Sequence, residues 1–211
     1  MRMLRRHLPL ILLAIASLVA VSATAIATGD ESNPPSDAPS QITEIETEAK
    51  EAMAVLNRDR TAGDALPAAL ATKMDEHSDF GMNPGLSRLA IGNMTNSVYV
   101  IPANGHVCAS LTVGDGANLT CPPAGDVAAG TASAATVTLE TGGIGIYGLV
   151  PDGVESVSVQ TATSEAIHGA TENNAFYTAV PAGTSLRTLR YTGPSGPVEF
   201  PIYDPAMADG Q

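Results

Sequence analysis

Residues 97–113, SVYVIPANGHVCASLTV, decide the fold. Two apolar runs, residues 97–102 and 106–113, flank the dipeptide Asn104-Gly105. Asn-Gly favours a type I′ turn, because both central residues of that turn need positive φ angles, and this turn joins neighbouring antiparallel strands. Within residues 106–113 apolar and polar side chains alternate with a period of two, as on a strand with one face toward a core. The stretch therefore predicts a β-hairpin.

The same pattern continues toward the C-terminus. From Ser87 onward, short β-branched runs alternate with Gly, Pro and Asn about every eight to twelve residues, which is typical of a β-sandwich or barrel. Turns are predicted at Gly142-Gly143, at residues 150–153 and at residues 193–196. The further strands are predicted at residues 136–141, 144–150, 154–160, 166–171, 175–180, 186–191 and 198–203. The predicted fold is mostly β or α+β, an antiparallel β meander of about ten strands that is sandwich-like or barrel-like.

One or two short helices are expected before the strands. Thr43 and Glu46 have the spacing of a capping box, and apolar residues follow at helical intervals, which predicts a helix over residues 44–57. Asp64, with a proline three residues later, gives a second start signal and predicts a shorter helix over residues 65–74. These helices are expected to pack at one end of the β-rich domain or to form a stalk.

The N-terminus has the features of an export signal. Three arginines lie within residues 1–7, an apolar run follows over residues 8–21, and residues 22–27 are small and contain two Ala-x-Ala cleavage sites. The alternative is a retained anchor, because residues 8–27 are long enough to span a bilayer with the arginines on the cytoplasmic side. Both interpretations remain open. Both place the rest of the chain outside the cytoplasm, either secreted or anchored to the cytoplasmic membrane.

Residues 28–41 contain prolines and acids but no large apolar side chain, a composition that cannot bury enough surface to fold. This stretch is expected to be a linker. The predicted organisation is a signal peptide or signal anchor (1–27), a disordered linker (28–42), a helical segment (43–80), a β-rich extracytoplasmic domain (81–205) and a tail (206–211).

Charge and composition exclude several classes of partner. Residues 28–211 contain seven Lys and Arg against 22 Asp and Glu, and none of the cations lies between Arg88 and Arg187. Such a surface repels phosphate, so nucleic acid is excluded and contact with a membrane is limited to residues 8–27, if they are retained. The aromatic content of 4%, with no Trp, argues against sites that stack bases or sugars. The expected partner is a protein or an envelope component.

The two cysteines are predicted to form a disulfide. If Gly114-Asp115 is a two-residue turn, Val113 and Gly116 close it, and Cys108 and Cys121 each lie five residues beyond that pair. They then face each other at a non-hydrogen-bonded position, where the Cα atoms come close enough for a disulfide. An exported chain is expected to oxidise such a pair. The predicted role of the bridge is structural.

Alternatives for the cysteines remain open at this point. If Asp115-Gly116 formed the turn, Cys108 would face Pro123 and lie diagonal to Cys121, so a bridge would need a distorted strand. Two free or redox-active thiols are the other alternative. Residues 118–121 resemble the neighbourhood of the nucleophile in sortases, which are extracytoplasmic cysteine transpeptidases. Those enzymes need a distant upstream His and a nearby Arg, whereas here His106 lies on the same hairpin and Arg187 is the next arginine. The spacing does not support a sortase.

Other motifs give no site. Residues 143–148 match the dinucleotide-binding pattern Gly-x-Gly-x-x-Gly, but a strand is expected to continue where that motif needs a helix. The histidines outside the signal and the polar residues near Cys121 lack metal-ligand spacing; they are His77, His106, His168, Asp115, Asn118 and Asp126. We assign no catalytic, cofactor-binding or metal-binding residue and expect no cofactor. A Ser-His-Asp triad assembled in space remains an alternative.

Several stretches are similar to uncharacterised exported or membrane-anchored proteins of high-GC actinobacteria. The most specific is Gly148-Leu149-Val150-Pro151-Asp152-Gly153-Val154; the others are Val100-Ile101-Pro102 followed by Cys108, Asn173-Asn174-Ala175-Phe176 and Arg58 to Pro67. The resemblance implies an exported location and no activity. Together with the composition, it favours a non-catalytic structural or protein-interaction domain at the cell envelope. The alternatives are an envelope hydrolase or transpeptidase and a small-ligand or cation binder.

Overall fold

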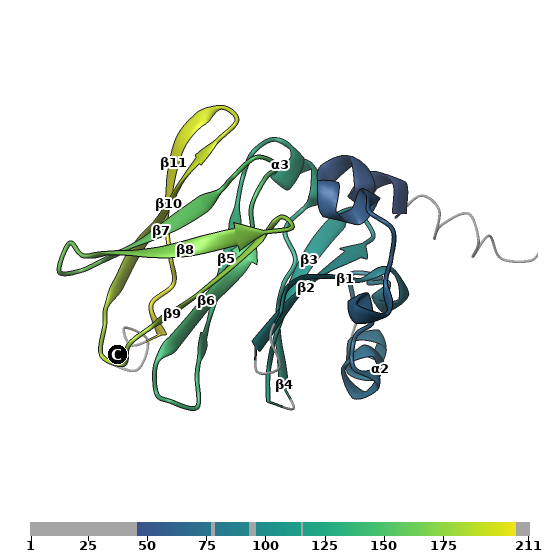
Figure 1. Cartoon of the computed structure of the whole chain (residues 1–211), viewed down its shortest axis with the longest axis horizontal. Coiled ribbons are helices and arrows are strands. Elements are labelled where there is room, and N and C mark those ends of the chain that lie inside the picture. Colours follow the sequence, from purple (N-terminus) through teal and green to yellow (C-terminus); the bar gives the residue numbers. More distant parts are fainter. Residues whose placement is uncertain (1–45, 77–78, 93–95, 115, 206–211) are drawn as a thin grey trace, which may run out of the picture. The chain divides into compact units, whose positions relative to one another are not determined.

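The computed structural model describes residues 46–76, 79–92, 96–114 and 116–205. Two antiparallel sheets dominate it, as the sequence predicts (Figure 1). The first sheet is a meander in the order β1-β2-β3-β4, formed by Arg88–Gly92, Asn96–Ala103, His106–Val113 and Gly116–Thr120. The second has the order β11-β10-β7-β8-β9-β6-β5. Its strands are β5 Ser133–Thr138, β6 Ile144–Leu149, β7 Ser156–Thr161, β8 Ala166–Glu172, β9 Ala175–Val180, β10 Leu186–Gly193 and β11 Gly196–Pro201.

The second sheet bends between β8 and β9. These strands pair at only two positions, Thr171 with Phe176 and Glu172 with Ala175. The bend divides the sheet into β5-β6-β9 and β7-β8-β10-β11, and apolar side chains of the two parts form one buried cluster. Ile146 and Phe176 from the first part and Leu189 from the second are fully buried in it. The sheet therefore forms half of a barrel around this cluster.

A second buried cluster fills the space between the first sheet and β6-β9. Val100, Ala109 and Leu111 supply one side of this cluster, and Tyr147 and Leu149 supply the other. Successive side chains on β6 point to opposite faces, so its even-numbered residues enter the half-barrel cluster and its odd-numbered ones this second cluster. All of β6 is buried for that reason.

The hairpin of β2 and β3 is confirmed, with Ala103 opposite His106 across the Asn-Gly turn. One expectation about it was incomplete. Only one face of residues 106–113 was expected to be core, but Cys108 and Ser110 on the other face are also buried. A third cluster covers them, to which Leu70 and Met74 of helix α2 (Ala68–Glu76) contribute. Sheet and helix thus enclose β2 and β3 on both faces.

The helical segment is part of the core and not a stalk. Residues 46–52 are helical, and the 3-10 helix η1 (Ala54–Asn57) follows, close to the predicted range. Met53 and Leu56 are almost fully buried in the cluster between the sheets. The remaining short elements are η2 (Ala62–Asp64), η3 (Pro84–Leu86) and α3 (Ala124–Ala128). Helix α2 begins later than predicted, because Asp64 caps η2 and not α2.

Some strand boundaries also differ from the prediction. Strand β5 starts and ends three residues early, and residues 139–143 form a loop in which the amide of Leu139 donates to the carbonyl of Gly143 and the amide of Gly142 to the carbonyl of Leu139. Strand β7 starts at Ser156, two residues late, because the turn before it is shifted by one position: the amide of Val154 donates to the carbonyl of Pro151. Gly153 has φ +81° and so occupies the position of that turn that needs a left-handed backbone.

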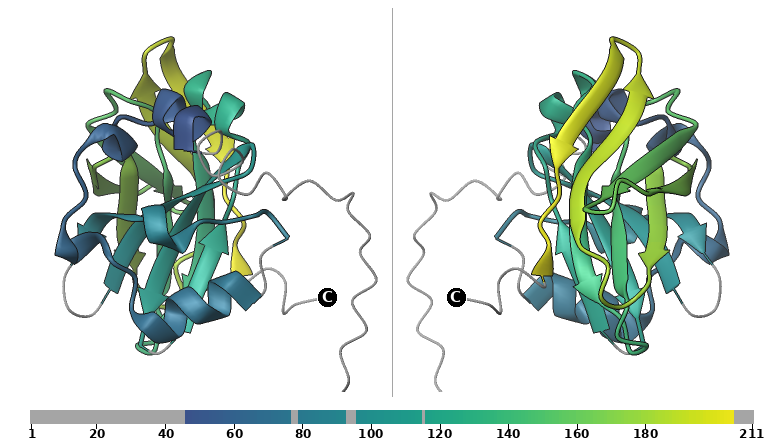
Figure 2. Two further views of the ribbon diagram at one scale, coloured as in Figure 1. Left: turned by 90° about the vertical axis from the view of Figure 1, so that its right-hand side faces the viewer. Right: turned by 90° about the vertical axis from the view of Figure 1, so that its left-hand side faces the viewer.

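Strand β11 is an edge strand that carries two prolines. Pro197 pairs with Thr192 and Pro201 with Thr188, and a proline has no N–H to donate. Ladder positions alternate, so residues 197, 199 and 201 direct their backbone groups away from β10. Of these three positions only Glu199 offers an N–H to the open edge, which is seen at the front of the right-hand view in Figure 2. A further strand would find almost no donors there.

Candidate functional site

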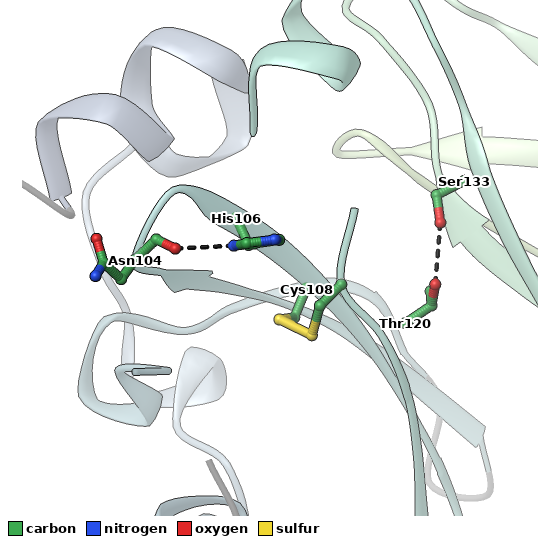
Figure 3. Close-up of a disulfide and its surroundings, with 6 residues drawn as sticks. Asn104, His106, Cys108, Thr120 and Ser133 are labelled. Carbon is green, nitrogen blue, oxygen red and sulfur yellow. Dashed lines mark hydrogen bonds between the residues drawn. A yellow bond between two sulfur atoms is a disulfide. The ribbon is translucent and has the colours of Figure 1, made fainter. Parts of the chain in front are cut away.

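The predicted disulfide joins the ends of β3 and β4. Val113 pairs with Gly116, as the predicted register requires, and the Cys108 and Cys121 Cα atoms lie 4.0 Å apart (Figure 3). The Cys108 side chain is fully buried. Both sulfur atoms are in the bridge, so neither cysteine is available as a thiolate nucleophile. This arrangement excludes the sortase-like alternative and the free-thiol alternative.

His106 lies near the bridge but has other partners. Its Nδ1 donates to the carbonyl oxygen of Asn104 at 2.8 Å, and its ring contacts that of Phe80 edge to face, with centroids 5.0 Å apart. The nearest buried hydroxyl on the same strand, Ser110 Oγ, has no hydrogen-bond partner among the described residues. Among the described residues, His106 and Ser110 therefore do not form a base and nucleophile pair beside the disulfide.

Removing the disulfide by the double substitution Cys108→Ser and Cys121→Ser is expected to lower the free energy of unfolding by about 2 to 4 kcal/mol. The bridge closes a loop with a sequence separation of 13 residues, and it mainly restricts the unfolded chain. Equilibrium denaturation of the two proteins measures the difference. Thiol labelling before and after reduction is the companion test, and two labelled cysteines in the native, unreduced protein would contradict the bridge.

A groove of about 860 Å³ lies on the outer face of β7, β8, β10 and β11. A row of four directly paired residues crosses it: Glu199, Arg190, Ser158 and His168, one from each strand. Directly paired residues of antiparallel strands share one face, so these four side chains point to the same side of the sheet. Arg190 Nε donates to Glu199 Oε2 at 2.8 Å. The Arg190 guanidinium holds the pKa of Glu199 below its usual range.

This row does not have the arrangement of a hydrolase. Ser158 Oγ accepts a hydrogen bond from Gln160 Nε2 at 2.9 Å, and among the described residues none links Ser158 to His168. An acyl-transfer site also needs free N–H donors for the oxyanion. Here the Glu199 amide faces the open edge by itself, while Arg190 and Ser158 lie on strands that are paired on both sides. The groove is open and lined by both polar and apolar side chains, and it resembles a binding surface more than a reaction site.

A second groove of about 560 Å³ adjoins the first, and both are lined by Gly153 and Glu155. Its wall is the turn of Asn173 and Asn174, which have φ angles of 49° and 63° and connect β8 to β9. Asn174 Oδ1 accepts from the amide of Val55 at 2.9 Å, and Asn173 Nδ2 donates to the carbonyl of Ala90 at 3.0 Å. The turn is thus fixed to both the helical segment and the first sheet.

Asp64 and Arg58 close the free edge of β1, an arrangement that the sequence did not reveal. The Asp64 side chain is 1% exposed, and both of its oxygens accept from the Arg58 guanidinium. Asp64 Oδ1 accepts from the amide of Leu89 at 2.9 Å, and Arg58 Nη2 donates to the Leu89 carbonyl at 2.9 Å. Together the two side chains hydrogen-bond the amide and the carbonyl of Leu89, as a neighbouring strand would. Only the Thr61–Asp64 spacing, typical of a helix cap, hinted at part of it.

Other residues singled out in the sequence are not brought together. Residues 144–149 are a strand, as expected, and the dinucleotide pattern is therefore not at a strand-to-helix turn. Within the described ranges no group of three or more His, Cys, Asp or Glu could hold a metal ion. His168 lines the large groove and His106 does not. His77, Asp115 and the predicted export signal lie outside the described residues.

Searches of protein-family models, curated proteins and solved structures find no significant match to this chain. In the part of the chain that the structure describes, every helix is too short or too polar to cross a membrane.

Proposed function

We propose that this protein is an extracytoplasmic interaction domain of the cell envelope, and that the groove on the outer face of β7, β8, β10 and β11 is its binding surface. The observation that carries the proposal is the groove itself. It is open and lined by both polar and apolar surface, and among the described residues its cross-strand row holds no hydrogen-bonded base and nucleophile pair. Open surfaces of this kind suit contact with another macromolecule better than enclosure of a small substrate.

The disulfide supports the extracytoplasmic part of the proposal. Disulfides persist in oxidising compartments and are rare in the cytosol. The arginine-flanked apolar run of residues 8–21 and the likeness to exported actinobacterial proteins point the same way. Retention by residues 8–27 would hold the domain at the membrane surface through the linker of residues 28–42.

Replacing Leu12 and Leu13 with arginine is expected to keep the protein in the cytoplasm, because each charge in the middle of such a segment costs about 2.5 to 3.5 kcal/mol on insertion scales. Cell fractionation measures the location, and the cysteines of the retained protein are expected to be reduced. Normal delivery of the variant to the envelope would contradict the proposal. Mass spectrometry of the wild-type N-terminus then separates cleavage from anchoring.

The binding surface can be tested by photocross-linking in intact cells. A photoactivatable phenylalanine analogue at Thr192, which is exposed and lines the groove, is expected to yield a discrete adduct. The matched control carries the analogue at Ala117, which is exposed on β4 of the other sheet. Equal adducts at both positions, or none at Thr192, would overturn the assignment of the groove.

A further inference from the structure

The two grooves form one continuous surface. Gly153 and Glu155 line both of them, so the outer face of β7, β8, β10 and β11 adjoins the space beside the Asn173-Asn174 turn. Two features make this surface rigid: its floor is a paired sheet, and its wall is the hydrogen-bonded turn. A rigid surface loses little conformational entropy when a partner binds.

The charges along this surface do not balance. Its two arginines are already paired, Arg190 with Glu199 and Arg58 with Asp64. Glu155 and Glu172 are exposed, line the grooves and have no ion pair within the described residues. A surface with unmatched carboxylates attracts a positively charged partner and rejects an acidic one.

The protein has few cations of its own to supply this charge. Residues 28–211 contain seven Lys and Arg against 22 Asp and Glu. Lys50 is paired with Glu46, and the Arg88 side chain is buried and donates to the carbonyls of Leu86 and Ser87. The chain therefore offers few cations of its own that could pair with Glu155 and Glu172.

The carboxylates are spread over the surface and do not converge, so the matching positive charge is expected to be spread out as well. In the described ranges no three acidic, His or Cys side chains converge on one point, so a single metal ion is not the match. The floor of the larger groove adds Ser156, Ser158 and Thr192, whose hydroxyls can hydrogen-bond to a peptide backbone. Distributed negative charge beside such hydroxyls fits an extended chain with several basic side chains.

We propose that this continuous surface binds an extended, Arg- or Lys-rich polypeptide segment of an envelope partner. The proposal rests on the proposed function, because it names the partner chemistry of the same surface. Glu155 and Glu172 face the basic side chains of the segment, and the hydroxyls of β7 and β10 contact its backbone.

The test measures binding of a fluorescein-labelled nona-arginine peptide by anisotropy at low salt, with a nona-glutamate peptide as the negative probe. The variant Glu155→Gln with Glu172→Gln is expected to bind about three- to tenfold more weakly than the wild type, as two exposed ion pairs would provide. The control variant Glu48→Gln with Glu51→Gln removes the same charge from the exposed face of the helix of residues 46–52. It is expected to bind within about twofold of the wild type.

Equal weakening in both variants would mean attraction to the overall net charge and would overturn the proposal. So would an absence of measurable binding to nona-arginine. The result is separable from that of the proposed function. If Thr192 yields an adduct but the peptide assay shows no selectivity for nona-arginine, the groove remains the binding surface and the cationic partner is rejected. If Thr192 yields no adduct, the groove itself is rejected as the binding surface. Thermal unfolding of both variants confirms that they fold, since all four substituted side chains are exposed.

Discussion

Substituting alanine for Gly148 is expected to lower the free energy of unfolding by about 3 kcal/mol or more, or to prevent folding. A Cβ atom at this position would lie 1.8 Å from the carbonyl oxygen of Ser133 and 2.9 Å from the Cα of Ala134. Both obstacles are backbone atoms of β5, which pairs directly with β6, so no side-chain rotation relieves the clash. Strand β5 would have to move away from the sheet.

Alanine variants at two other glycines serve as comparisons, and chemical denaturation measures the free energy of unfolding of all three variants. At Gly145 a Cβ would meet side-chain atoms of Val137 and Leu139 at 3.0 and 3.1 Å, which can yield, so a smaller loss is expected. At Gly125 in α3 it would meet nothing within 4 Å, so alanine is expected to be neutral or slightly stabilising. Equal stability of the Gly148 and Gly125 variants would refute the packing argument.

Replacing Asp64 with alanine is expected to destabilise the protein by roughly 2 to 4 kcal/mol. Breaking a buried ion pair from one side costs about 3 to 5 kcal/mol, and water reaching Arg58 reduces this cost because its side chain is 34% exposed. The variant also leaves the amide of Leu89 without its acceptor. Equilibrium denaturation measures the loss, and a variant as stable as wild type would show that solvent replaces the network.

Asp64 also makes stability depend on pH. The Arg58 guanidinium, with help from the Thr61 and Leu89 amides and against the effect of burial, holds the pKa of Asp64 well below its usual range. The unfolded chain binds a proton near pH 4, so the stabilisation is complete above that pH and is lost as the pH falls toward the lower folded-state pKa. Burial lowers the pKa of the neighbouring Arg88, and the Asp64 charge opposes this shift.

The Asp64→Asn variant is therefore expected to lose less stability than wild type between about pH 4 and pH 2. Denaturation curves at a series of pH values measure this slope. Glu165→Gln is the control, because it removes an exposed carboxylate from the turn between β7 and β8. If wild type and the Asp64→Asn variant had the same acid dependence, the network would not be the cause.

Local sequence predicted the hairpins and the disulfide because each depends on neighbouring residues. The Asn-Gly turn sets the pairing of β2 with β3, and the closing pair Val113 and Gly116 sets the position of Cys108 opposite Cys121. Strand order could not be obtained in this way. Strand β9 pairs with β6 and β10 with β7, and these pairs join segments separated by other strands. The choice among such partners depends on tertiary packing.

The candidate site was hidden for the same reason. His168 was noted in the sequence, but its neighbours Ser158, Arg190 and Glu199 lie on three other strands. The early start of β5 was missed because Ser133, Ala134 and Ala135 are small and lack β-branched side chains. The close approach of β5 to Gly148 makes small residues suitable there, and that contact is visible only in three dimensions.

The two prolines of β11 and the closure of β1 by Arg58 and Asp64 have a consequence for crowded conditions. When many copies of this protein are held close together, their sheet edges meet often. Cross-β fibres grow by adding backbone to such edges, and here the β11 edge offers few amide donors while the Leu89 backbone on the β1 edge is already bonded to side chains. Even in a dense array, these two edges are therefore protected from pairing with the edges of other copies to form fibrils. Contacts between copies at these edges involve side chains and not backbone hydrogen bonds.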